Sequence, residues 1–308
     1  MKPSDPIISV LLPVYNGFPF LPTTIESVCR QTERRWVMYA INDGSQDESG
    51  AWLDTLTDPR IEVIHQANQG LSQTLNDGLK LCQTKYIARL DADDICHPER
   101  FAKQLDYLET HPEVGLLGTQ IRRLGSRRTD RGSHLPTDHN AILTALMAGQ
   151  HAICHPTIMC RADAFREVGD YRPCVGEDWD IYLRFAERWK LANHPECLLD
   201  YRFHSGSING ARMNEMRRQI RFHCENARLR NVNQDEISLG DFEDLERAKG
   251  RIWNWRQRIE DLSRARYHAA TANILGEQPI RGWLQMAGAA LTAPHLTMMR
   301  VTRKFRQR

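Results

Sequence analysis

Short runs rich in valine and isoleucine alternate with helix-length amphipathic stretches early in this chain, and no other feature limits its fold as much. The runs that we expect to form strands are Ile8–Val14, Val37–Asn42, Ile61–His65 and Tyr86–Leu90. Pro22 stands where a first helical turn would begin, and Gly70 opens a helix that continues through Leu81. This order predicts an α/β fold with a parallel sheet covered by helices on both faces.

Polar residues follow these expected strands. Tyr15 and Asn16 follow the first strand, Asp43 follows the second, and an acidic group begins with Asp91 after the fourth. Ligands of parallel sheets bind beyond the carboxyl ends of the strands. We therefore expect the functional site at this edge.

The pattern is less regular after Glu113. Residues 122–139 are predicted to form a charged loop, 155–161 a strand, 177–189 a helix and 191–202 extended structure. Beyond Gly210 the pattern is helical, over 214–231, 242–274 and 283–305. We therefore divide the chain into a first domain, residues 1–210, and a helical C-terminal region, residues 211–308.

The two regions differ in charge. Residues 211–308 contain 19 lysines and arginines against 11 carboxylates, whereas residues 1–210 contain 22 against 28. An acidic body can hold a cation, and a basic tail can approach a polyanion or an anionic membrane.

The cysteines and the apolar segments indicate in which cellular compartment the protein works. Eight scattered cysteines without a Cys-x-x-Cys pair favour neither a zinc ribbon nor a secreted disulfide framework, and they fit a reducing cytoplasm. The apolar stretch 7–14 is too short for a signal-peptide core. Residues 282–299 are interrupted by Gln285, Pro294 and His295, so we expect no membrane span.

Three carboxylates follow the fourth expected strand. Asp91 and Asp93 stand one residue apart at a strand end and can turn toward one cation, and oxygen-only ligands suit Mg²⁺ or Mn²⁺. A solvated acidic turn is the alternative. Asp94 can instead cap a helix that begins near Pro98.

Three further motifs each have a functional and a structural interpretation. Asp43 can accept a hydrogen bond from a base or ribose, or its segment can form an Asx turn with Gly44 at the bend. Glu177 and Asp178 can include a general base, or can simply favour the start of a helix. His204 can be a metal ligand or an ordinary hydrogen-bonded histidine.

Seven segments occur in a particular order: Pro13-Val14-Tyr15-Asn16-Gly17, Asn42-Asp43-Gly44-Ser45, Asn68-Gln69-Gly70-Leu71, Asp91-Ala92-Asp93-Asp94, His155-Pro156-Thr157, Glu177-Asp178 and Tyr201-Arg202-Phe203-His204. Over residues 7–210 this combination resembles family 2 glycosyltransferases of the bacterial surface-polysaccharide type. The resemblance implies a GT-A fold, a Rossmann-like and mostly parallel sheet flanked by helices, with a C-terminal helical extension.

The resemblance assigns residues to the nucleotide-sugar donor. Pro13, Val14 and Tyr15 match residues that line the nucleotide base, and Asp43 matches the carboxylate that pairs with uracil in enzymes that use UDP-sugars. Gly70 belongs to the same nucleotide-binding set.

The resemblance also implies a metal site and a catalytic base. Asp91 matches the first acid of the DxD motif, near the ribose, and Asp93 matches the acid that binds a divalent cation, Mn²⁺ or Mg²⁺. His204 lies where some relatives have an additional metal ligand. Glu177 and Asp178 match the ED motif, whose Asp is the usual base of inverting members.

The chemistry agrees with these residue types. Displacement at the anomeric carbon leaves a nucleoside diphosphate, whose charge a cation on Asp93 can neutralise. A base such as Asp178 can deprotonate the acceptor hydroxyl, which typically contributes ~10²- to 10⁴-fold. Leu75 stands where many relatives have arginine, so we expect no diphosphate contact there.

The C-terminal segment combines apolar and basic residues. Trp283, Ala287, Ala290, Leu291, Pro294, Met298, Val301 and Phe305 recur at helical steps, and Arg300, Arg303, Lys304, Arg306 and Arg308 follow closely. This pattern suits an interfacial helix on an anionic membrane, with core packing or oligomerisation as alternatives. Because no nucleic-acid-binding module is present, we expect no nucleic-acid partner.

The family resemblance, together with the residue chemistry and the basic tail, implies an inverting, metal-dependent glycosyltransferase that transfers a sugar from a nucleotide donor, UDP-linked by preference, to a glycan or lipid-linked acceptor. We expect a cytoplasmic protein, peripheral on the inner face of the membrane. The alternatives are a catalytically inactive nucleotide-sugar-binding scaffold and a nucleotidyltransferase. The latter would release pyrophosphate.

Overall fold

The computed structural model describes residues 5–125, 129–130, 132–202, 213–276 and 278–296. The chain divides into two compact units, one of residues 1–123 and 131–202 and the other of 124–130 and 203–308. The domain boundary predicted near residue 210 falls within 203–212, outside the described residues.

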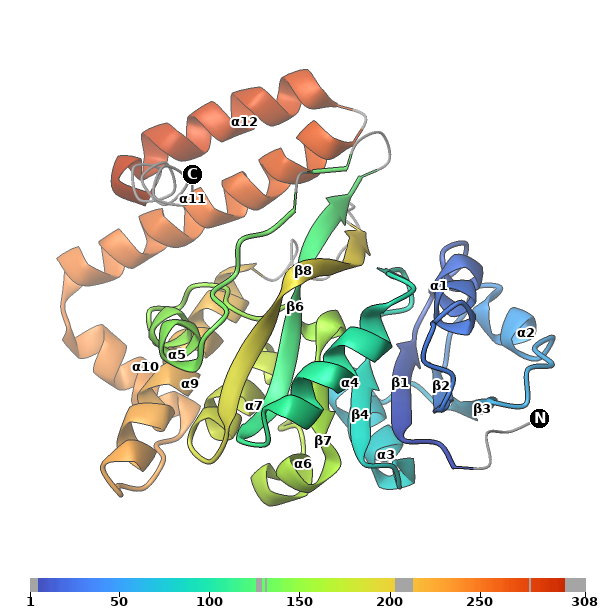
Figure 1. Cartoon of the computed structure of the whole chain (residues 1–308). Coiled ribbons are helices and arrows are strands. Elements are labelled where there is room, and N and C mark those ends of the chain that lie inside the picture. Colours follow the sequence, from blue (N-terminus) through green and yellow to red (C-terminus); the bar gives the residue numbers. More distant parts are fainter. Residues whose placement is uncertain (1–4, 126–128, 131, 203–212, 277, 297–308) are drawn as a thin grey trace. The chain divides into compact units, whose positions relative to one another are not determined.

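The first unit is built on an eight-stranded sheet in the order β3-β2-β1-β4-β7-β6-β8-β5 (Figure 1). The strands are β1 (Ile8–Val14), β2 (Trp36–Asp43), β3 (Ile61–Gln66), β4 (Tyr86–Arg89), β5 (Ile95–Cys96), β6 (Val114–Leu124), β7 (Met159–Arg161) and β8 (Lys190–Arg202). The first four are parallel to one another, as the sequence predicts. The pairs β4–β7, β6–β7 and β5–β8 are antiparallel, so the sheet is mixed.

Both faces of the central strands are buried, which explains their nearly continuous apolar sequences. On one face, Val10 and Leu12 belong to the main hydrophobic core. On the other face, Leu11 and Ile41 lie against a helix, where a Cβ atom on Gly78 would be only 2.7 Å from Ile41 Cδ1. Glycine at this position lets the helix approach the sheet closely.

The helices of this unit are α1 (Leu21–Cys29), α2 (Ser49–Leu53), α3 (Leu71–Leu81), α4 (Arg100–Thr110), α5 (His139–Met147), α6 (Ala162–Val168) and α7 (Glu177–Ala186). Pro22 lies in the first turn of α1, and Gly70 is the N-cap of α3 with φ 85°, so both predicted helix starts are confirmed.

Two sequence predictions are wrong in this unit. Regularity does not weaken directly after Glu113, because β6 is an eleven-residue strand that covers residues 122–124 of the segment expected as a loop. The described residues from 125 to 138 belong to no helix or named strand, as expected for that loop. The first eight residues of β6 are buried, so this strand lacks the alternation of a half-exposed strand. The expected strand 155–161 begins instead as a 3₁₀ turn, His155–Thr157, and only its last residues form β7.

The second unit is helical, as expected, with α9 (Met213–Asn231), α10 (Leu239–Ala248), α11 (Arg251–Leu275) and α12 (Pro279–Thr292). The helix expected over 242–274 is interrupted at Gly250, which has φ 91° and follows the end of α10. The helix expected over 283–305 ends at Thr292 in the described part, and residues 297–308 are not described.

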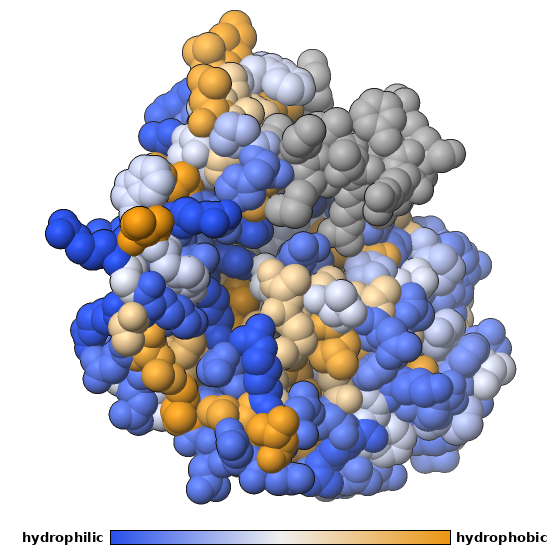
Figure 2. Space-filling model, turned by 90° about the vertical axis from the view of Figure 1, so that its left-hand side faces the viewer, coloured by the Kyte–Doolittle hydropathy of each residue, from blue (hydrophilic) through white to orange (hydrophobic). Residues whose placement is uncertain are grey.

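α11 and α12 pack against each other. The Ser263 hydroxyl donates to the Ala289 carbonyl at 2.9 Å, and Gly282 fits closely against Ile274. Figure 2 shows hydrophobic residues at the top of the view, where α12 lies. Among the described helices, none combines the length and the low polarity needed to cross a bilayer.

Candidate active site

The loops that follow β1 and β2 are tied together at the carboxyl edge of the sheet. The Asn16 N–H donates to Ser45 Oγ at 3.0 Å, and the Gln46 N–H donates to Asn16 Oδ1 at 2.8 Å. Asn16 has φ 51°, a left-handed conformation that asparagine tolerates better than most residues. The parallel register brings these loops together, as expected.

Asp43 is buried at the end of β2 and holds the loop that leads into α3. Its Oδ1 accepts hydrogen bonds from the Gln69 N–H at 2.8 Å and from Gln66 Nε2 at 2.9 Å, and its Oδ2 accepts one from the Gly70 N–H at 2.9 Å. Three of about four acceptor positions are thus used within the chain. One position remains for an external donor.

The Asx turn considered from the sequence is present, with Asn42 as its side-chain acceptor. The Ser45 N–H donates to Asn42 Oδ1 at 3.0 Å. Gly44 has φ 70°, and a Cβ atom there would lie 2.7 Å from the Asn68 nitrogen, so glycine is required at this bend.

The residues matched to the nucleotide base differ in exposure. The Tyr15 side chain is 52% exposed, whereas Val14 is fully buried and Pro13 partly buried. An aromatic ring at Tyr15 can therefore stack on a base, while Val14 contributes to the core. Leu75 is also buried, in keeping with the expectation that this position makes no diphosphate contact.

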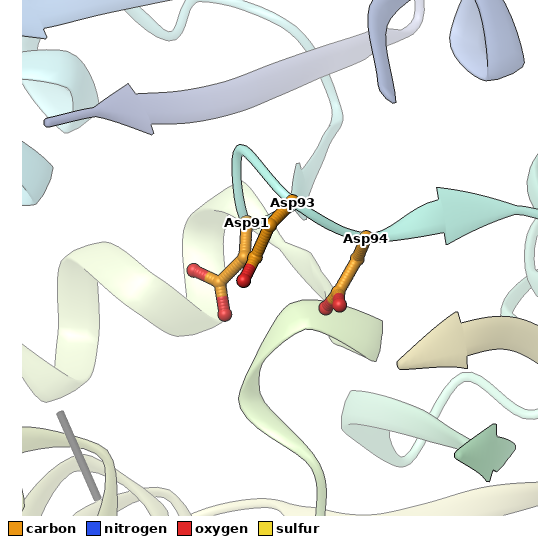
Figure 3. Close-up of side chains that lie close together, drawn as sticks. All are labelled: Asp91, Asp93 and Asp94. Atoms are coloured by element: carbon orange, nitrogen blue, oxygen red, sulfur yellow. The ribbon is translucent and has the colours of Figure 1, made fainter. Parts of the chain in front are cut away.

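The acidic turn Asp91–Asp94 follows β4 (Figure 3). One carboxylate oxygen from each of Asp91, Asp93 and Asp94 lies within 4.8 Å of those of the other two. Gly17 allows this turn to approach the first loop, because a Cβ atom there would be 3.0 Å from Ala92 Cβ. The turn also receives a 3.0 Å hydrogen bond on the Ala92 carbonyl from Thr24 Oγ1 of α1.

Arg89 holds Asp91 in a forked ion pair. Its Nη1 donates to Asp91 Oδ2 at 2.9 Å, and its Nη2 contacts the other carboxylate oxygen. The arginine side chain is only 4% exposed, and its two hydrogen bonds fix the carboxylate plane. Sequence analysis did not single out Arg89, although a charged residue at the end of an apolar strand is a usable signal.

Asp94 lies fully buried beneath the same turn. Its Oδ1 accepts a 2.8 Å hydrogen bond from the Arg202 N–H, while its Oδ2 has no hydrogen-bond partner in the described part of the chain. Burial, followed by the negative charges of Asp91 and Asp93, raises the pKa of Asp94 well above its usual range. Asp94 is not the cap of α4, whose N-cap is Glu99.

Arg202, at the end of β8, braces the turn from the other side. Its Nε donates to the Asp93 carbonyl at 2.9 Å, and its guanidinium lies 4.2 Å from the centre of the Phe20 ring. The sequence identified the segment that contains Arg202 but not this contact. His204, two residues further on, lies outside the described residues.

Glu177 and Asp178 form the first turn of α7, after Gly176 with φ 79°. Burial, and then the charge of Asp178, raises the pKa of Glu177 to about 7. Arg89 and Asp91 are near enough for their charges also to act on Glu177, so α7 begins beside the acidic turn. The predicted helix at this position is confirmed.

His155 links α7 to the loop before it. Its Nδ1 lies 3.9 Å from Glu177 Oε1, and its Nε2 forms a 2.8 Å hydrogen bond with the Tyr171 hydroxyl. Burial and the nearby Arg89 charge lower the pKa of His155 well below its usual range. The imidazole is therefore neutral at physiological pH, so it does not form a charged pair with Glu177.

The acidic turn fits a divalent cation. Asp91, Asp93 and Asp94 offer only hard oxygen donors, and one of the oxygens is buried without a partner in the described chain. Mg²⁺ and Mn²⁺ prefer such donors. Thus these residues can hold the cation that the sequence predicts.

Known proteins share the sequence pattern of this first unit. Residues 9–169 match the family model described as "Glycosyl transferase family 2". The chain belongs to this family. The resemblance found from the ordered motifs is thereby confirmed, and this family 2 member is a glycosyltransferase.

Relatives similar in sequence are also named as glycosyltransferases. The chain is 32% identical over 215 residues to the amylovoran biosynthesis glycosyltransferase AmsE of Erwinia amylovora, covering 67% of this chain and 80% of that protein. It is 30% identical over 212 residues to the O-antigen biosynthesis glycosyltransferase WbnJ of Escherichia coli, covering 65% of this chain and 81% of the relative.

Solved structures share the fold. The structure of S. aureus TarS 1-349 in complex with UDP-GlcNAc has a TM-score of 0.61 at 13% identity and covers 92% of this chain and 88% of its own. The mannosyltransferase PcManGT from Pyrobaculum calidifontis, in complex with GDP-Man and Mn2+, has a TM-score of 0.57 at 17% identity, covering 96% and 83%. The expected GT-A fold is confirmed.

Proposed function

We propose that this family 2 member is an inverting, metal-dependent glycosyltransferase that uses a UDP-sugar and glycosylates a hydroxyl of a polysaccharide, lipopolysaccharide or lipid-linked acceptor. The observation that carries the proposal is the meeting of two acidic groups at one sheet edge. Asp91 and Asp93 lie in the turn after β4, and Glu177 and Asp178 begin α7 beside them. The first group would bind the nucleotide-sugar donor and its cation, and the second would accept the proton of the acceptor hydroxyl.

The donor side is assigned to the loops after β1, β2 and β4. We propose that Tyr15 stacks on the base, that the remaining acceptor position of Asp43 receives a donor from uracil, and that Gly70 presents its backbone close by. Apart from its neighbours along the chain, no described residue lies within 4 Å of a Cβ position on Gly70, so its surroundings are open. The neighbours in complex with UDP-GlcNAc and GDP-Man support a nucleoside diphosphate sugar as donor.

Asp93, with Asp91 held by Arg89 and His204 as a further ligand, is proposed to bind the divalent cation. When bound, a cation of this kind neutralises negative charge that develops on the departing diphosphate. The Mn2+ in the mannosyltransferase neighbour supports such a site. Arg202 keeps the turn in place through the Asp93 carbonyl.

Asp178 is proposed to accept the proton of the acceptor hydroxyl. The new bond forms between that oxygen and the anomeric carbon as the bond to the diphosphate breaks, which inverts the configuration. The Trp179 N–H donates to Asp178 Oδ1 at 2.9 Å and orients the carboxylate. Glu177, protonated in part near neutral pH, limits the negative charge in the site.

The relatives support the choice of acceptor, and the basic C-terminal segment supports a location at the membrane. AmsE and WbnJ are named for amylovoran and O-antigen biosynthesis, which supports a surface-glycan acceptor. We propose residues 1–210 as the catalytic domain and 211–308 as a region that contacts the inner face of the membrane through its C-terminal segment, residues 281–308. The chain would then work in the cytoplasm.

A panel of nucleotide sugars tests this function. Purified protein is incubated with each donor and Mn²⁺ or Mg²⁺, and the released nucleotide is identified. We expect UDP from one UDP-sugar, only with metal. Release of pyrophosphate would indicate nucleotidyl transfer, and absence of turnover with every donor and acceptor preparation would favour the inactive scaffold.

A further inference from the structure

The His-Pro-Thr segment, residues 155–157, has no role in the proposed reaction, although its histidine lies beside Glu177. His155 is buried, and each of its ring nitrogens faces a polar atom. Its Nε2 forms a 2.8 Å hydrogen bond with the Tyr171 hydroxyl, and its Nδ1 lies 3.9 Å from Glu177 Oε1. A neutral imidazole carries one proton on one of its two nitrogens. The nitrogen that carries it decides whether Glu177 faces a donor or an acceptor.

The Tyr171 hydroxyl decides where this proton lies. Burial raises the pKa of Tyr171 well above its usual range, so the hydroxyl keeps its hydrogen. Among the described residues, the only hydrogen-bond partner of this hydroxyl is His155 Nε2. Buried donors are nearly always paired with an acceptor. The hydroxyl therefore donates to Nε2, and the proton of the imidazole lies on Nδ1.

Glu177 favours the same tautomer of His155. An N–H group at Nδ1 attracts the Glu177 carboxylate, whereas a bare nitrogen there would place two acceptors face to face. The distance of 3.9 Å is longer than a hydrogen bond, so the contact is an attraction between the N–H dipole and the carboxylate. Such attractions are stronger among buried groups than in water. The Tyr171 and Glu177 side chains thus favour one arrangement of the ring between them.

Two helices outside α7 hold Tyr171 in place. From α3, Asn76 Nδ2 donates to the Tyr171 carbonyl at 2.8 Å, and the Tyr171 N–H donates to Asn76 Oδ1 at 2.8 Å. From α6, the Phe165 ring packs against the Tyr171 ring with their centres 5.5 Å apart. The backbone and the ring of Tyr171 are therefore both fixed, and with them the position of its hydroxyl.

We propose that Tyr171 is a positioning residue for the acidic pair at the start of α7, an inference that rests on the function proposed above. Its hydroxyl fixes His155 with the proton on Nδ1, and this N–H orients the Glu177 carboxylate beside Asp178. The charges of Glu177 and Asp178 act on each other. The orientation of Glu177 therefore sets the electrostatic field in which Asp178 takes up the acceptor proton.

Nuclear magnetic resonance tests the tautomer in the full-length chain. Long-range ¹H–¹⁵N spectra of histidine-labelled protein distinguish the two ring nitrogens, and His155→Gln identifies the signals of His155. We expect Nδ1 to carry the proton in wild type. In Tyr171→Phe the Nε2 atom loses its donor, so the Nε2–H form should appear. A wild-type proton on Nε2, or an unchanged tautomer in Tyr171→Phe, would overturn the proposal.

Turnover tests the positioning, with the UDP-sugar selected from the donor panel. Tyr171→Phe should lower kcat by about tenfold and leave the affinity for UDP unchanged, because the lost hydrogen bond acts on the acid pair and not on the donor. Tyr86→Phe is the matched control and should turn over like wild type. It removes a 2.8 Å hydrogen bond to Glu109 from a buried tyrosine at the opposite end of β4 from the acidic turn.

A double-mutant cycle separates positioning from simple packing. If Tyr171 acts through Glu177, the effect of Tyr171→Phe on kcat should shrink below about twofold in a Glu177→Gln background. An equal loss in both backgrounds, or no loss in the wild-type background, would show that Tyr171 only packs. Failure of the glycosyltransferase proposal would instead appear in wild type itself, as absence of UDP release, while the spectra decide the tautomer without any turnover.

Discussion

The Gly70 N–H donates a 2.9 Å hydrogen bond to Oδ2 of Asp43, so the carboxylate assigned to the nucleotide base also holds the start of α3. Gly70 is the N-cap of that helix and can adopt the required φ of 85°. Substitution of Asp43 therefore acts on the loop as well as on the nucleotide. A test of Asp43 needs a control that disturbs the loop alone.

Gln66→Ala provides that control. It removes one donor to Asp43 but keeps the carboxylate. We expect Asp43→Ala to weaken UDP binding by roughly 10- to 100-fold, since an unmatched polar group costs ~1 to 3 kcal/mol, and Gln66→Ala to weaken it far less. Calorimetry on both variants measures this, with thermal melting to report loop damage. Equal affinities in wild type and Asp43→Ala would remove Asp43 from the donor site.

Asp93→Ala should abolish binding of Mn²⁺. The substitution removes an oxygen ligand from the acidic turn while Arg89 and Arg202 still hold the rest. Electron paramagnetic resonance of free Mn²⁺ measures binding with and without UDP. Asp163→Ala, at a carboxylate that is 83% exposed and far along the chain, is the control and should bind as wild type. Undiminished Mn²⁺ binding by Asp93→Ala would contradict the metal assignment.

Asp178→Asn should lower turnover by ~10²- to 10⁴-fold while leaving donor affinity unchanged. The amide is nearly the same size but cannot take up the acceptor proton. Single-turnover kinetics and calorimetry separate the two effects. Near wild-type transfer by Asp178→Asn, together with a large loss in Glu177→Gln, would move the base to Glu177.

Glu177 should make the protein less stable as the pH rises toward 7. Its pKa is about 7 in the folded chain against 4.5 ordinarily, so the folded state binds this proton more tightly. The associated stability is fully present below pH 4.5 and is lost as the pH rises through about 7. From 1.36 kcal/mol per pKa unit, the loss is up to about 3 kcal/mol.

Chemical denaturation at pH 5 and pH 8 measures this effect without metal. In Glu177→Gln the side chain no longer titrates, so the part of the stability loss that comes from Glu177 should disappear. Asp178→Asn removes the negative charge that raises the Glu177 pKa, and should shift the fall to lower pH. A wild type and Glu177→Gln with identical pH dependence would show that Glu177 titrates normally.

Much of the fold follows from local sequence. β1, β2 and β4 were predictable because both of their faces are buried and most of their residues are apolar, as with Val10 and Leu11. β3 lies at the edge of the sheet and is only partly buried, and it was predictable from its branched residues Ile61, Val63 and Ile64. The starts of α1 and α3 follow from Pro22 and Gly70, whose backbone preferences act locally. Gly250 shows the limit, because a glycine within a helical pattern marks either a break or a tolerated position.

The antiparallel part of the sheet did not follow from the sequence. β7 is three residues long and pairs with β4 and β6, which lie far from it along the chain. β6 has no alternation because its first eight residues are all buried. Strand direction and burial on both faces depend on partners distant in sequence, and periodicity does not report them.

For the candidate site, the sequence by itself determined which carboxylates lie at the sheet edge, because strand ends and their order fix the positions of Asp43, Asp91 and Asp93. Only the tertiary structure decided their surroundings: the donors on Asp43, the Arg89 fork on Asp91 and the burial of Glu177 beside His155. Hydrogen bonds and pKa values depend on atoms within a few ångströms. The fold, not the local sequence, brings those atoms together.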